Sequence, residues 1–154
     1  MTVKRKSRTA RPKAMLLPLP ADTVRSISLE NHLALAAMRS GQGTSDTMIG
    51  LLRVLYMTYY LLEAQGYWVG LQAFLDDEAA LDESIRGAAV GREWQLAAER
   101  LPAIEEVLRR SDEVVGSIAR YRYVEAWGKL TRFVSADSGK HSPLPGSQLQ
   151  EART

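Results

Sequence analysis

One stretch of the chain, residues 48–62, is apolar at 12 of its 15 positions and restricts the available folds more than any other feature. Its apolar residues recur at helical spacing, and others on the remaining faces predict a helix surrounded by protein. Arg53 interrupts the window, which is shorter than the roughly 18 to 20 residues that a membrane span needs. The sequence therefore predicts a central, buried helix.

Local signals bound this central helix. Thr44 or Ser45 can accept hydrogen bonds from its first free amides. Gly66 can adopt the left-handed conformation that commonly ends a helix. We expect the helix to begin at Thr44 or Ser45 and to end at Gln65.

A second helix is expected before it. Asp22 or Ser28 can cap its first turn, and Arg39 is its expected last residue. Gly41 and Gly43 follow, and both are expected to provide the left-handed exit from the helix. This turn is a clear boundary between two helices.

Two further helices complete the predicted core. An amphipathic helix spans about residues 71–90, and a long helix starts near Pro102 and reaches about Val134, with a bend expected at Gly116. Few segments alternate as a half-buried strand would. The prediction is an all-α fold, a single compact bundle of about four to five helices with a long C-terminal helix and disordered tails.

The chain length and composition predict one folded domain with tails. A chain of 154 residues can bury one core, and 45% hydrophobic residues are ordinary for a globular protein. Residues 1–20 form a basic arm and a proline-stiffened connector, and residues 21–134 form the helical domain. Residues 135–154 are rich in Ser, Gly and Pro without a periodic apolar face, so we expect a disordered tail.

The basic charge of the chain is concentrated at its start. The net charge is only +2, yet six cations and no acid lie within residues 1–13, which leaves 14 basic residues against 18 acidic ones in the remainder. A positive arm of this kind attracts phosphate backbones, acidic lipids or acidic protein surfaces. The nucleic-acid-binding candidates in this arm are Lys4, Arg5, Lys6, Arg8, Arg11 and Lys13.

A second basic stretch lies in the predicted long helix. Residues 120–123 alternate arginine with tyrosine, a pattern typical of surfaces that contact phosphates and stack on unpaired bases. Consecutive helical residues point in different directions, so the alternative is that the aromatic residues are buried and the cations face water. The candidates for phosphate contact are Arg120, Arg122, Lys129 and Arg132.

The predicted helix at residues 71–90 carries a dense acidic cluster. Its spacing lacks the loop and glycine of an EF-hand, and a solvated helix face is the commoner explanation for such a run. The alternative is a face that receives a basic partner or the chain's own arm. The partner-binding candidates are Asp76, Asp77, Glu78, Asp82 and Glu83.

Most enzymatic chemistry lacks the residues that it needs. The chain has no cysteine, which excludes disulfides and thiolate ligands and fits a reducing cytoplasm, and no export signal is evident. Only His32 and His141 are available as histidines, so a metal cluster or a catalytic triad is poorly supplied. No glycine-rich phosphate loop follows a predicted strand. We therefore expect no catalytic residues, no metal and no cofactor.

The order of several segments resembles a known group. The run Leu17-Pro-Leu-Pro, the run Ser28-Leu-Glu-Asn-His-Leu-Ala-Leu, a Gly-x-Gly turn and the run Leu51-Leu-Arg-Val-Leu-Tyr are similar to small proteins of proteobacterial mobile elements, often labelled Fis-family transcriptional regulators. The resemblance covers about residues 15–135. It implies a plasmid, integrative-element or phage setting and a regulatory role.

Two functions follow as hypotheses. The first is a non-enzymatic, cytoplasmic, nucleic-acid-associated regulatory or accessory protein, dimeric through an exposed apolar helix face and not associated with a membrane. The alternative is a protein inhibitor, anti-CRISPR-like, that docks on a host nucleoprotein complex through its acidic helix. A third interpretation leaves the basic arm simply solvated.

Overall fold

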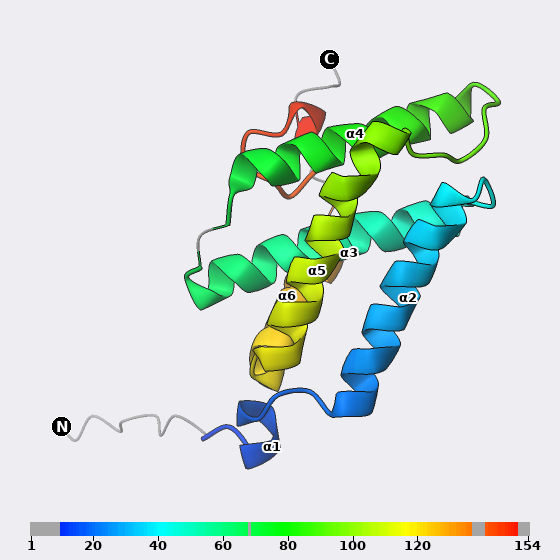
Figure 1. Ribbon diagram of the computed structural model, residues 1–154. Helices are drawn as coiled ribbons and strands as arrows, with labels where there is room; N and C mark the ends of the chain where they lie inside the picture. Colours follow the sequence, from blue (N-terminus) through cyan, green and yellow to red (C-terminus); the bar gives the residue numbers. More distant parts are fainter. Residues whose placement is uncertain (1–9, 68, 137–140, 151–154) are drawn as a thin grey trace.

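Helices form nearly all of the regular structure in residues 10–67, 69–136 and 141–150, which the computed structural model describes (Figure 1). The predicted all-α class is confirmed for these residues, although six α-helices are present instead of four to five. None of them has the length and apolarity that crossing a bilayer requires. The helices are α1 (Lys13–Leu16), α2 (Ala21–Arg39), α3 (Ser45–Gln65), α4 (Leu71–Ala89), α5 (Leu101–Ser117) and α6 (Arg120–Ser135).

Helix α3 occupies the centre of the bundle, with α2, α4, α5 and α6 packed around it (Figure 1). Every residue from 54 to 62 is buried, which confirms the predicted central helix. Its ends are also as predicted. Thr44 and Thr47 exchange backbone and side-chain hydrogen bonds at its start, and Gly66 ends it at a φ of 70°.

The turn before α3 confirms only part of the prediction. Gly41 has a φ of 75°, as expected for the residue that leaves a helix. Gly43 does not have a positive φ. A Cβ there would lie 2.4 Å from the sulfur of Met38 and 2.6 Å from the carbonyl oxygen of Trp94, so close packing requires this glycine. Neither Asp22 nor Ser28 caps α2 as expected. The helix begins at Ala21, directly after Pro20 at the N-cap position, and no side chain caps it.

The expected long C-terminal helix is wrong because two helices replace it. Ile118 and Ala119 adopt extended backbone angles, and Ile118 is completely buried. Ala119 forms an isolated bridge with Pro18, and the backbone amide of Arg120 donates to the carbonyl of Leu17. The break lies two residues beyond Gly116, where the N-terminal connector supplies the hydrogen bonds that a continuing helix would have made.

The break changes which residues α6 buries. Trp127 and Val134 would face inward on the predicted continuous helix, but their exposed fractions are 43% and 75%. Leu130 is buried, as the helical spacing predicts, and so is Ala126. Helix α6 therefore carries part of its apolar surface on the outside of the molecule.

The C-terminal segment 141–150 packs against the bundle, which corrects the expectation of a disordered tail for these residues. Leu144 is completely buried within the core cluster. The hydroxyl groups of Ser142 and Ser147 donate to the carboxylate of Glu78 on α4, and they accept the backbone amides of residues 144 and 149. One apolar anchor and a set of satisfied polar groups thus hold the segment in place.

We expect Leu144→Ala to lower the free energy of unfolding by about 3 kcal/mol, because a fully buried leucine loses its contacts and leaves a cavity. Urea denaturation followed by circular dichroism measures the change. The matched control is Gln148→Ala in the same segment, whose side chain is exposed and whose substitution should cost less than about 0.5 kcal/mol. Equal stability of the two variants would contradict the packing of this segment.

Candidate functional site

Arg11, near the end of the basic arm, contacts two residues of α6. Nη2 of Arg11 lies 2.9 Å from Oε1 of Glu125, and the guanidinium of Arg11 lies 4.0 Å from the ring centroid of Tyr121. Helix α1, which begins two residues later, packs on the same helix, and Lys13 within it is exposed. The other arm candidates, Lys4, Arg5, Lys6 and Arg8, lie outside the described residues.

One face of α6 carries both this attachment and a further cation. Tyr121, Glu125, Gly128 and Arg132 follow one another at intervals of four and three residues, which places them along one side of a helix. A Cβ at Gly128 would lie 3.3 Å from Nη1 of Arg132, so the exposed Arg132 side chain reaches back over this glycine. Arg11 and Arg132 therefore belong to one surface, the basic face of α6.

Two of the predicted nucleic-acid contacts bond to α3 instead of standing free at the surface. Arg122 donates to the carbonyl oxygen of Ala64 in the last turn of α3, where a cation also interacts favourably with the helix dipole. Nζ of Lys129 lies 3.4 Å from Oε1 of Glu63 and 4.6 Å from the ring centroid of Tyr60. Both cations attach α6 to α3.

Arg120 lies on a different side of the helix from Arg132. It is exposed, and its spacing matches Val124 and Trp127 at intervals of four and three residues. Of the four basic candidates in this stretch, Arg132 is the one that lies in line with Tyr121 and Glu125 and has no ion pair among the described residues.

The acidic cluster of α4 does not form one surface. Asp76 and Glu83 are exposed, and Asp82 pairs with Arg86 at 2.9 Å. Asp77 and Glu78 are buried, which corrects the expectation that all five carboxylates face solvent or a partner. The physical reason is that α4 is covered on two sides, by α3 and α5 and by the C-terminal segment.

Glu78 is the centre of a buried polar cluster. The hydroxyl of Tyr56 on α3 donates to its Oε2 at 2.7 Å, and the hydroxyls of Ser142 and Ser147 also donate to its carboxylate. Burial, followed by the nearby carboxylate of Glu78, raises the pKa of Tyr56 well above its ordinary value. The tyrosine is therefore a permanent donor, and the cluster joins α3, α4 and the C-terminal segment.

Asp77 is also buried, but its carboxyl has no such hydrogen bonds within the part of the chain that the structure describes. Burial raises its pKa to about 6, the neighbouring carboxylate of Asp76 adds to the increase, and the guanidinium of Arg100 opposes it. Because the carboxyl titrates higher in the folded chain than in the unfolded one, protonation stabilises the fold. This stabilisation is complete below about pH 4 and is lost as the pH rises through 6.

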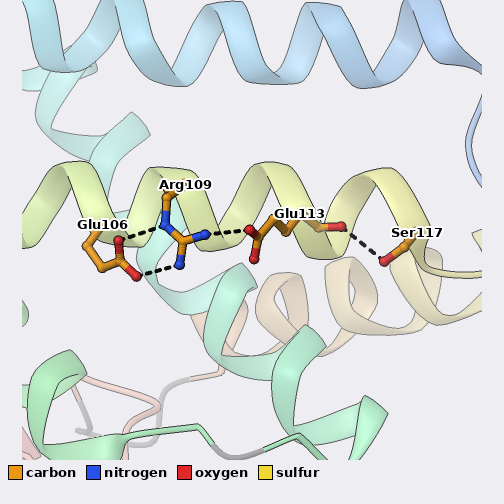
Figure 2. Close-up of polar contacts among 4 residues, drawn as sticks. All are labelled: Glu106, Arg109, Glu113 and Ser117. Carbon is orange, nitrogen blue, oxygen red and sulfur yellow. Dashed lines mark hydrogen bonds and ion pairs between the residues drawn. The ribbon is translucent and has the colours of Figure 1, made fainter.

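The outward surface of α5 is neutralised within the helix, as Figure 2 shows. Arg109 bridges Glu106 and Glu113, and the hydroxyl of Ser117 donates to the carbonyl oxygen of Glu113 at 3.0 Å. The hydrogen bond from Arg109 lowers the pKa of Glu106. Between α2 and α5, Nε2 of His32 lies 2.9 Å from Oδ2 of Asp112, so this histidine takes part in a surface contact between the two helices.

An apolar groove between α3 and α6 is the surface that sequence reasoning missed. Ile49 and Trp127 line it, and its volume is about 330 Å³. On one continuous helix, spacing alone would place Trp127 in the core. Sequence patterns do not reveal the break at Ile118, after which Trp127 lies at the surface. Among the described residues, no group of three or more carboxylates and histidines is arranged to hold a metal ion.

The comparisons with known proteins identify no family for this chain. A scan against protein-family models finds no match, and neither curated proteins nor solved structures yield one. The class that the structure defines is therefore an all-helical protein with a basic face and an apolar groove on one helix, α6.

We expect Asp77→Asn to raise the free energy of unfolding at pH 8 by about 2 to 3 kcal/mol, because the amide removes the cost of ionising a buried group. At pH 4 the parent carboxyl is already protonated, so the two proteins should be equally stable. Urea denaturation at both pH values measures the difference. Glu83→Gln, an exposed position on the same helix, serves as the control and should show no such gain; a pH-independent effect of Asp77→Asn would contradict the assignment.

Proposed function

We propose that this protein is a non-enzymatic, nucleic-acid-associated accessory or regulatory protein of a bacterial mobile element, which contacts phosphates through its arm and the basic face of α6. The observation that carries the proposal is the attachment of Arg11 to Tyr121 and Glu125. It brings together two basic segments that are more than 100 residues apart in the chain.

Covalent geometry limits how far the remaining arm cations can be from this face. A chain spans at most about 3.5 Å per residue, so Arg8 begins within about 11 Å of Arg11 and Lys4 within about 25 Å. Four arm cations are thereby tethered beside Lys13 and Arg132, both exposed. A phosphate backbone lying along α6 could meet about six positive charges.

The attachment to α6 gives the arm a defined origin and uses one of its six cations, Arg11. Arg11 is neutralised by Glu125, whereas the body outside the arm has more acidic than basic residues. Favourable contact with a polyanion is thus confined to the arm and its immediate surroundings, and non-specific phosphate contact should dominate affinity.

Less structural evidence supports the alternative function, a protein inhibitor that docks on a host nucleoprotein complex through α4. Burial of Asp77 and Glu78 removes two of its five carboxylates from the surface. Affinity capture from the host with and without nuclease treatment separates the two functions, because only a protein partner survives the nuclease.

Deletion of residues 1–9 tests the arm. With about six phosphate contacts, we expect log affinity for duplex DNA to fall against log salt with a slope near −5, and the deletion should reduce this slope to about −2. Fluorescence anisotropy across 50–200 mM salt measures both slopes. The control exchanges lysine and arginine at positions 4, 5, 6 and 8, which conserves charge and should leave the slope unchanged; an unchanged slope after deletion would exclude the arm.

A matched pair on α6 tests the role of its face. Arg132→Ala should reduce the magnitude of the salt slope by about 1, because one phosphate contact is lost. Arg122→Ala should leave the slope unchanged but lower the melting temperature, since Arg122 bonds to α3. Anisotropy and thermal denaturation of the same samples check both results, and the reverse pattern would place the phosphate contacts on the other side of α6.

A further inference from the structure

The groove between α3 and α6 is apolar and open to solvent. Ile49 is 59% exposed, and with Trp127 and Val134 it leaves three large apolar side chains at the surface. Leu52, Tyr56 and Leu130 form the floor beneath them. Monomeric soluble proteins rarely expose large contiguous apolar patches unless they serve as a binding site.

Among the described residues, Arg53 is the only charged one that lines this groove, and Glu30 neutralises it. Its Nη2 donates to Oε1 of Glu30 at 2.9 Å, and its guanidinium lies 5.8 Å from the ring centroid of Trp127. The centre of the groove therefore offers no free charge to a ligand. A partner surface that fits here is apolar and uncharged at its own centre.

The apolar surface continues past Arg53 onto α2. A second shallow groove between α2 and α3 is lined by Leu33, Ala34 and Gly50, and it shares Arg53 with the first. Leu33 is exposed to about the same extent as Ile49. The exposed apolar side chains across α2, α3 and α6 form a suitable centre for an interface of roughly 800 Å² per partner. We call this surface the apolar face.

One acid and one base mark opposite ends of the apolar face. Asp46 precedes Ile49 by three residues on α3, and Arg120 precedes Val124 and Trp127 on one side of α6. Both are exposed, and neither side chain has a hydrogen-bond or ion-pair partner among the described residues. Helix α3 begins beside the end of α2, whereas α6 begins beside α1 at the start of α2 (Figure 1). A 19-residue helix spans roughly 28 Å, so the two charges are well separated.

We propose that the apolar face binds a second copy of this chain in a two-fold symmetric homodimer. The partner surface must have an apolar centre without free charge, an acid at one end and a base at the other. The face itself meets each requirement, since its Arg53 pairs with Glu30. In a two-fold interface the same patch is used by both subunits, so Asp46 of each copy approaches Arg120 of the other. The basic face of α6 points elsewhere and stays accessible.

The dimer goes beyond the proposed function and can be tested without nucleic acid. Sedimentation equilibrium of the full chain should give about twice the 17.1 kDa of one chain. Ile49→Lys should yield a monomer, with a dimer dissociation constant raised at least tenfold, because each interface would bury two unpaired charges. Ile49 is exposed, so the variant should retain its circular dichroism spectrum and melting temperature.

The matched control is Val90→Lys, since Val90 is 75% exposed at the end of α4, away from the apolar face. This variant should remain a dimer. A monomeric wild-type chain at about 100 µM, or an Ile49→Lys variant as dimeric as the control, would overturn the proposal. Recovery of a different protein on a monomeric chain would overturn it as well.

Charge exchange tests the pairing itself. Asp46→Arg and Arg120→Asp should each weaken the dimer about tenfold, because each places like charges opposite one another twice. Mixing the two single variants should restore association as a heterodimer in which both contacts join opposite charges. If the mixture dimerises no better than either variant alone, the proposed two-fold arrangement is wrong.

Discussion

Burial of the second half of α3 on every side is the constraint on which the rest of the structure depends. Residues 54 to 62 are all buried, so no single neighbour can cover this helix, and α2, α4, α5 and α6 each take part of its circumference. Most helices of a globular protein need only one covered face. Here the chain must return to α3 repeatedly, and the reversal between α5 and α6 at Ile118 allows two successive helices to pack on it.

The same burial accounts for the polar interior. Tyr56 lies on α3 and needs a partner for its hydroxyl, which Glu78 supplies from α4. A buried carboxylate with one donor would be costly, and two serine hydroxyls from the C-terminal segment complete its hydrogen bonds. The folded conformation of residues 141–150 is therefore a consequence of α4 packing on α3. If only some of the hydrogen bonds to Glu78 were formed, all three elements would be destabilised.

Sequence patterns could predict what local chemistry determines. The capping pair at Thr44, the exit at Gly66 and the apolar window each act within a few residues, so the position of α3 was predictable. The break at Ile118 was not, because its hydrogen bonds come from Leu17, about 100 residues away. Likewise, helical spacing places Glu78 on the side of Phe74 and Leu81, but its hydrogen-bond partners there include serines more than 60 residues later in the chain, which no pattern within α4 reveals. The predicted nucleic-acid contacts were divided in the same way, since only the fold decides that Arg122 bonds to α3 while Arg132 stays at the surface.

The short helix α6 has three different surfaces. Ala126 and Leu130 pack on the core, Trp127 and Val134 belong to the apolar face, and Arg132 lies on the basic face. Exposed ion pairs elsewhere contribute little stability, but they neutralise cations such as Arg53 and Arg109 that would otherwise attract a polyanion or oppose docking. Under the two proposals, phosphates would meet the arm and Arg132, and an apolar partner would meet Ile49 and Trp127. The two surfaces would not compete, because they lie on different sides of one helix.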